Sequence, residues 1–255
     1  MIRIRVDLTN PGAFFGCCGL FELAHRLWPD TTCRFEDGEC VLSQGDLHEL
    51  VQEAARAPLI VLVKGDRAAS PMLLDRPFEL RIDWWKAGSG DPSLKSWAGR
   101  MLASRIALAM QRELPDTLEN GFFDDGHVVI GPDGNKVEPF YFDARRGASA
   151  LPLDVGFSSD ALGLETVAFP ATEFFTLIGL QRFRPASTRT ARVFRYRAWL
   201  AELPIRLAAL AAGNALPDDG PLLHFENAFR TDKRKHKAFT PAIPVSGAGN
   251  ERTQD

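Results

Sequence analysis

Hydrophobic and polar positions change their spacing from one segment of the chain to the next. Alternation at residues 2–6 predicts a first strand. Hydrophobic and polar residues alternate within 33–43 on both sides of the turn dipeptide Asp37-Gly38. This pattern predicts a hairpin or a strand around the turn. Further runs of strand length follow at 59–64, 78–85, 127–130, 138–143, 190–200 and 222–230.

Five other segments have the apolar spacing and the end signals of helices. Asn10 is a good N-cap residue, and Pro11 after it is favourable at the first helical position. Asp46 and Ser93 are candidate caps for the second and third helices. The expected helices lie at 11–28, 45–57, 91–114, 170–183 and 204–213.

Strands and helices are mixed here without strict alternation, which predicts the α+β class. We expect mixed or antiparallel sheets packed with helices, as a single large domain or as two tightly packed halves. The domain would span residues 1–240, with a weakly marked division near 114–121. Residues 241–255 are glycine, alanine, proline and polar residues, and we expect them to form a flexible C-terminal tail.

The composition is that of an ordinary soluble globular protein. Of the 255 residues, 45% are hydrophobic and 25% are charged. The longest purely apolar run, at 59–63, is far shorter than a membrane span, and the first residues do not have the apolar core of a signal peptide. We therefore expect a cytoplasmic protein that has no membrane partner.

The formal net charge of −3 conceals an asymmetry between the two ends of the chain. Residues 181–255 contain 13 Lys and Arg against 7 Asp and Glu, whereas residues 1–180 contain 17 against 26. Such a basic end favours a polyanionic partner. The candidate nucleic-acid-binding residues are Arg182, Arg184, Arg189, Arg192, Arg195, Arg197, Arg230, Lys233, Arg234, Lys235 and Lys237, together with Arg145 and Arg146 in an earlier loop.

Aromatic residues are interleaved with these arginines, and two interpretations follow. Arginine can bind phosphate through two parallel hydrogen bonds, while Phe183, Phe194 and Tyr196 could stack on bases. Alternatively, the charges form a solvated face and the aromatic residues belong to the core. Two dense clusters on neighbouring segments favour contact with a nucleic acid or an acidic partner.

The segment 9–30 contains two glycines and two adjacent cysteines near a helix start, which raises the question of a chemical site. Its spacing matches neither dinucleotide-binding nor Walker glycine patterns. Cys17 and Cys18 point about 100° apart on a helix, and with Cys33 and Cys40 they match no known zinc or redox spacing. We expect small packing residues here, with no metal and no cofactor.

Support for catalysis is thin. The five histidines are scattered, and no nucleophile elbow is present. A nuclease would need clustered carboxylates followed by a lysine, and the segment 137–143 lacks the lysine two places after Glu138. We expect no enzyme, and we interpret the central acids as turn and cap residues. These acids are Asp83, Asp124, Asp125, Asp133, Glu138 and Asp143.

Six motifs in a fixed order resemble a known family over most of the chain, from Val6 to about Phe239. The sequence resembles the small CRISPR-associated Csb-type protein of type I-U systems, also called I-G. That family is regarded as a reduced counterpart of the large subunit of type I effector complexes. The motifs are VDLTNPGAFFGCCGLFELAHRLWP, DWW…LKSWAG, PFYFDARRGASALPLDVGFSSDAL, PATEFFTLIGLQRFRP, RVFRYRAWLAELPIRLAA and ENAFRTDKRKHKAF.

The resemblance implies a non-enzymatic subunit of a crRNA-guided surveillance complex in antiviral defence. Its partners would be the backbone subunits and the crRNA-processing subunit, together with crRNA and target DNA. Large subunits contact duplex DNA beside the target and hold the opened strands. The resemblance assigns no role to individual residues, so the candidate phosphate contacts rest on the charge argument alone.

One departure and two alternatives stay open. Full-size large subunits end in a helical bundle that supports the displaced strand, whereas here the chain returns to a strand after residue 213. The protein could instead be a scaffold that docks on an acidic subunit by its basic face without touching nucleic acid. A metal-dependent nuclease that uses the central acids is the third hypothesis.

Overall fold

The computed structural model describes residues 1–99, 101–114, 121–146, 166–217, 219–230 and 236–245, with the backbone alone at Arg146. These residues form five α-helices and three antiparallel sheets in a single domain, which confirms the predicted α+β class. No helix among them is long and apolar enough to cross a membrane.

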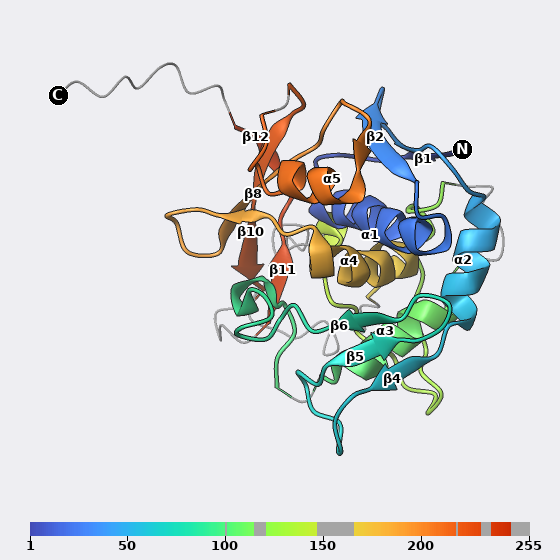
Figure 1. Cartoon of the computed structure of the whole chain (residues 1–255). Helices are drawn as coiled ribbons and strands as arrows, with labels where there is room; N and C mark the ends of the chain where they lie inside the picture. Colours follow the sequence, from blue (N-terminus) through green and yellow to red (C-terminus); the bar gives the residue numbers. More distant parts are fainter. Residues whose placement is uncertain (100, 115–120, 147–165, 218, 231–235, 246–255) are drawn as a thin grey trace.

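The centre of the molecule is a pair of helices, α1 (Pro11–Leu27) and α4 (Pro170–Arg182), which lie side by side in Figure 1. Glycine allows their backbones to touch. A Cβ added to Gly19 would lie 1.9 Å from the carbonyl oxygen of Phe175, and one added to Gly179 would lie 2.1 Å from that of Phe15. The glycines of the first motif are therefore packing residues, as the sequence predicted.

The first sheet lies beside α1 and has the strand order β1-β3-β2-β9. Asn10 caps α1 by accepting a hydrogen bond from the backbone N–H of Gly12, and the predicted hairpin around Asp37-Gly38 is confirmed. The predicted second helix is α2 (Leu47–Arg56), capped by Asp46. The strands are β1 (Ile2–Arg5), β2 (Thr32–Glu36), β3 (Glu39–Leu42) and β9 (Leu203–Pro204).

Two further sheets complete the fold (Figure 1). The second, toward the C-terminus, has the order β11-β10-β8-β7, and β12 also pairs with β10. The third has the order β4-β5-β6 and lies near α3 (Ala103–Arg112), while α5 (Ile205–Ala212) lies beside the first sheet and β8. The strands are β4 (Leu59–Val61), β5 (Met72–Leu74), β6 (Leu80–Ile82), β7 (Ala186–Ser187), β8 (Val193–Arg197), β10 (Leu222–Phe229), β11 (Lys237–Phe239) and β12 (Ile243–Pro244).

The predicted helix at 91–114 is wrong over its first half. Asp91, rather than Ser93, caps the short 3-10 helix η1 (Pro92–Leu94), and α3 begins only at Ala103. Between them the chain is held by distant partners, because the Trp97 ring packs among other aromatic rings and its indole N–H donates to the Ala68 carbonyl. Tertiary contacts override helix propensity here.

The strands predicted at 127–130 and 138–143 are also wrong, since these segments contain only isolated bridges or irregular backbone. In the second segment the amides of Phe142 and Asp143 donate to the buried carboxylate of Glu173 instead of to a strand. The next amide, of Ala144, donates to the Asn10 side chain. The N-terminal ends of α1 and α4 therefore hold this segment.

The ordered chain extends further than predicted. Ala242 is buried and its N–H donates to the Thr9 carbonyl, and Ile243 and Pro244 form β12. The expected flexible tail therefore cannot begin at residue 241. Residues 246–255 lie outside the described part of the chain, as do residues 115–120 of the division expected near 114–121.

Candidate nucleic-acid interface

The aromatic residues among the arginines are core residues. Phe183, Phe194 and Tyr196 are at most 1% exposed, and the Tyr196 hydroxyl donates to the Leu8 carbonyl at 2.6 Å. Along β8 the side chains alternate, so that Phe194 and Tyr196 point inward while Arg195 is exposed. The interpretation of base stacking on these rings is therefore wrong, and the alternation of VFRYR could have shown it.

Arg182 neutralises a buried acid between α1 and α4. Its guanidinium binds both carboxylate oxygens of Glu22, whose side chain is 1% exposed, and Arg26 binds the same carboxylate at 2.9 Å. Burial alone would raise the pKa of Glu22, but the two guanidinium groups hold this pKa below its ordinary value. Arg182 therefore has a structural partner and is a poor candidate for a phosphate contact.

Arg184 and Arg197 are likewise occupied by contacts within the chain. Arg184 donates to the carbonyl oxygens of Ser89 and Gln181. Arg197 donates to the Asn214 side chain at 3.0 Å and to the Gly220 carbonyl at 2.7 Å. Both residues hold loops in place.

The guanidinium of Arg145 also binds partners within the chain. It forms ion pairs with Asp143 and Asp124, donates to the Phe123 carbonyl, and lies 3.6 Å from the centre of the Phe169 ring. Arg146 is the last residue of the 3-10 helix η2 (Ala144–Arg146), and its side chain is outside the described part of the structure. The described contacts of Arg145 give it a role in the local structure.

Two arginines have the environment that a phosphate contact requires. Arg189 lies in the connection from β7 to β8, and Arg195 projects from the outer face of β8 opposite His224 of β10. Both are exposed, and neither has an ion-pair partner among the residues that the structure describes. This part of the sheet is therefore an available basic surface.

The remaining candidates lie around the end of β10 and the start of β11. Arg192 pairs with Glu226 at 3.2 Å and covers the Phe229 ring, and Arg230 lies 3.5 Å from the centre of the Tyr141 ring. Lys237 donates to the Ser93 carbonyl. Lys233, Arg234 and Lys235 lie between β10 and β11 in the sequence but outside the described residues.

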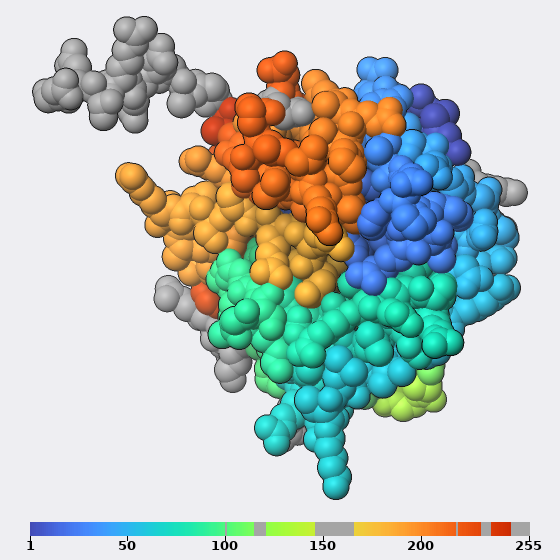
Figure 2. All heavy atoms as spheres, viewed as in Figure 1, coloured from blue at the N-terminus to red at the C-terminus, as the bar shows by residue number. Residues whose placement is uncertain are grey.

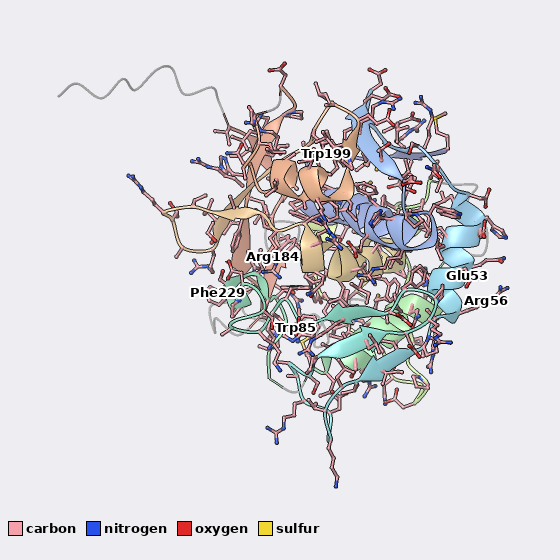
Figure 3. The ribbon with its side chains drawn as sticks, in the orientation of Figure 1. Glu53, Arg56, Trp85, Arg184, Trp199 and Phe229 are labelled. Carbon is pink, nitrogen blue, oxygen red and sulfur yellow. The ribbon has the colours of Figure 1, made fainter. Side chains whose placement is uncertain are left out.

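The fold adds one residue to this group. Lys95 follows η1, and the segment is held against the β10–β11 pair because the Asn227 side chain donates to the Ser93 carbonyl and the Lys237 backbone N–H donates to the Ser96 carbonyl. Figure 3 labels Phe229 beside this segment, and Figure 2 shows the segment packed against the β7–β8 region. Lys95 was not among the candidates from the sequence, because nothing local connects it to Lys237, which lies 142 positions away.

The central acids that a nuclease site would have needed have partners within the chain. Asp83 pairs with Arg81, Asp133 pairs with Arg105, and Glu138 accepts from Tyr141. Asp124 and Asp143 do approach each other, but they share Arg145 between them. The described residues contain no group of three or more His, Cys, Asp or Glu side chains that could hold a metal ion.

The four cysteines are brought closer together than their spacing in sequence indicated. All four are buried, and the sulfur atoms of Cys33 and Cys40 are 3.7 Å apart between β2 and β3. Burial raises the pKa of the Cys17, Cys18 and Cys33 thiols well above the ordinary value, which keeps these thiols neutral. Cys17, Cys18 and Cys33 pack as small apolar residues in the hydrophobic core.

Comparison with known proteins adds no relative. No family model, no curated protein and no solved structure matches the chain.

Proposed function

We propose that this chain is a non-enzymatic, cytoplasmic subunit of a crRNA-guided type I CRISPR effector complex, and that it contacts nucleic acid through its C-terminal sheet. The family resemblance of the sequence motivates the choice of complex. Its partners would be the backbone and crRNA-processing subunits, with crRNA or target DNA as the ligand. The absence of catalytic activity is part of this proposal.

The observation that carries the nucleic-acid part is the exposed basic surface on β8 and its neighbours. Arg189 and Arg195 face solvent, and Lys95, Arg192 and Lys237 lie at the adjoining end of the sheet. Sequence-independent binding to nucleic acid rests mostly on such contacts between cations and backbone phosphates. The surface is smaller than the sequence predicted, because Arg145, Arg182, Arg184 and Arg197 have partners within the chain.

The first experiment measures binding of labelled single-stranded and duplex DNA, and of crRNA-length RNA, by the full chain and by the reconstituted complex. We expect the affinity to fall steeply as salt rises, since phosphate binding releases counterions. Replacing Arg189 and Arg195 together by Glu should abolish most of this binding. Exposed Arg56 on α2 lies at the opposite side of Figure 3 from Phe229, so Arg56→Glu is the matched control.

The scaffold hypothesis is the second candidate, and α5 favours it. This short helix is apolar on its inner face and on part of its outer face, where Leu207 and Leu210 are exposed, as is Leu200 just before it. Apolar side chains gathered on a surface often mark a protein contact. A scaffold would dock on an acidic subunit by its basic face, and this apolar face would add a second protein contact.

The same variants separate the two candidates. A double Arg189→Glu, Arg195→Glu chain that assembles normally but no longer binds nucleic acid supports the proposal. If assembly is lost while the complex contacts nucleic acid through other subunits, the scaffold is supported. Absence of binding at low salt, both by the chain and by the complex, would refute the nucleic-acid proposal.

A further inference from the structure

Three cationic side chains from distant parts of the sequence converge where β10 ends and β11 begins. Lys237, the first residue of β11, is the cross-strand neighbour of Phe229 on β10. The Arg192 guanidinium, just before β8, lies 4.8 Å from the centre of the Phe229 ring. Lys95 follows η1, whose Ser93 carbonyl accepts a hydrogen bond from the Lys237 ammonium at 2.9 Å.

The charges of this cluster do not cancel. Burial first, and then the positive charges of Arg192 and Lys95, lower the pKa of Lys237 to about 8, while Asp91 opposes this shift. Glu226 pairs with Arg192, so among the described residues the cluster holds three cations and two carboxylates, those of Glu226 and Asp91. One positive charge is left over, which matches the single negative charge of a phosphodiester better than the two charges of a phosphate monoester.

An unused donor gives a second, independent observation. The Nε–H group of Arg192 is buried and has no acceptor among the described residues, although Arg192 donates to Glu226 through Nη2. Buried polar groups in folded proteins are nearly always hydrogen-bonded, so an unpaired guanidinium donor in a positive cluster points to an acceptor that binds there. An anionic oxygen is the strongest acceptor for such a donor.

The surroundings hold the three side chains in position. Arg192 lies on the Phe229 ring, and the Lys95 ammonium lies 5.3 Å from the centre of the Trp97 ring. Asn227, which is fully buried, donates from its side chain to the Ser93 carbonyl at 2.8 Å and thereby fixes η1 against β10. Cations that are already ordered lose less side-chain entropy when they bind a ligand.

We propose that Lys95, Arg192 and Lys237 form one binding site for a phosphodiester group. In a nucleic acid this group is a backbone phosphate, so the inference rests on the proposed function and names one of its contacts. The site reads no base, because it offers charge and N–H donors, and Arg192 covers the half-buried Phe229 ring. Binding at this site is therefore independent of sequence.

The experiment uses the full chain and a labelled single-stranded oligonucleotide of about 20 nucleotides. Neutralising one phosphate contact, by Lys237→Gln, Lys95→Gln or Arg192→Gln, should weaken binding about tenfold and reduce the salt slope by about one. Lys64→Gln, between β4 and β5, and Arg56→Gln, on α2, remove single positive charges from exposed positions elsewhere and should change neither quantity. Urea unfolding shows that each variant is folded at the temperature of the assay.

A pH series gives a result that a purely structural role would not produce. A phosphodiester keeps its charge between pH 7 and pH 9, whereas the Lys237 ammonium loses its proton over this range, with a pKa of about 8. The native affinity should therefore fall about tenfold from pH 7 to pH 9. Lys237→Arg should bind as the native chain does at pH 7 and lose this fall, because arginine stays protonated.

Two results would overturn the inference. If the native chain binds the oligonucleotide and Lys237→Gln binds as tightly as Lys64→Gln, the site is refuted while the proposed function stands. If neither the native chain nor the reconstituted complex binds nucleic acid, the proposed function fails, and dimethyl phosphate then tests the site alone. A rise in melting temperature with dimethyl phosphate, relative to chloride at equal ionic strength, that Lys237→Gln abolishes would support the site; no rise would refute it.

Discussion

Arginine occupies two different environments in this protein, and the comparison separates stability from binding. Between α1 and α4, Arg182 lies against a buried carboxylate and has a partner within the chain. On the outer face of β8, Arg195 is exposed and has no ion-pair partner among the described residues. Both residues belong to one basic stretch of sequence, so charge density alone does not identify a binding surface.

The difference has a physical origin in the neighbouring element. The helix pair buries almost every side chain between its members, and a charge there must be compensated because its desolvation is costly. The sheet has one inner and one outer face, so every second residue of β8 stays in water. We therefore expect changes at the helix pair to lower stability and changes on β8 to lower affinity.

The largest effect should come from the contact between the helix backbones. Gly19→Ala places a methyl group 1.9 Å from the Phe175 carbonyl oxygen, and neither backbone can yield without separating the helices. We expect a loss of about 3 kcal/mol or more in the free energy of unfolding, measured in urea.

Gly16→Ala is the graded control for this prediction. The new methyl group there would meet only the edge of the Phe123 ring, at 2.9 Å, and a side chain can move. We expect a smaller loss in the free energy of unfolding than for Gly19→Ala. Equal losses at the two positions would contradict the close approach of α1 and α4.

The second effect concerns the buried ion pair. Glu22→Gln leaves Arg182 and Arg26 without their carboxylate and should cost about 3 kcal/mol at pH 7. Because the pKa of Glu22 is lower in the folded chain than in the unfolded chain, its contribution is present above the unfolded pKa. This contribution is lost as the pH falls through the folded pKa.

A series of urea titrations from pH 7 down to pH 3 tests whether the contribution of Glu22 to stability is lost toward acid. The native chain should lose stability toward acid more steeply than Glu22→Gln does, so the two curves approach each other. Parallel curves would show that Glu22 has no shifted pKa in the folded chain.

A third, smaller effect is expected from the cysteines on α1. Replacing Cys17 and Cys18 together by Ala should cost about 2 kcal/mol, because each change removes a buried sulfur atom from a packed core. The thiols of Cys17 and Cys18 should react with a disulfide reagent only as the chain unfolds, since they are buried and neutral. Zinc in stoichiometric amount in the purified protein would contradict this packing role.

The smallest effect on stability should come from a change at Arg195 on β8. This change tests most directly the difference between the exposed arginine and the buried Arg182. Arg195→Gln is expected to change the free energy of unfolding by less than about 0.5 kcal/mol, as at other exposed positions. It should weaken nucleic-acid binding and reduce the salt slope by about one. Arg182→Gln should lower the free energy of unfolding and leave the affinity for nucleic acid nearly unchanged. Similar losses of stability in the two variants would contradict the difference between the two arginines.

Local signals allowed much of the fold to be predicted. The cap and proline at Asn10 and Pro11, the turn at Asp37-Gly38 and the cap at Asp46 each act within a few residues, and the elements they predicted are confirmed. The helix at 91–114 failed because partners of Trp97 and Ser93 come from other parts of the chain. Propensity does not include such contacts.

The candidate site was predictable only in part, for a similar reason. A basic C-terminal region is visible in the charge count, and the alternation along β8 indicates that Arg195 faces away from Phe194 and Tyr196. No sequence signal shows that Arg182 meets Glu22, which lies 160 positions away, or that Lys95 lies near Lys237. Both relations depend on how the elements pack.

The sequence by itself determined the class of fold, the main helices and the sign of the charge at the C-terminal end, because these follow from spacing, caps and composition. Only the tertiary structure decided which cations are compensated and which face solvent. Compensation requires an acid to come within a few ångströms, and for Arg182 that acid is Glu22, 160 positions away along the chain. The same packing turned the glycines and cysteines of α1 into the contact surface of the central helix.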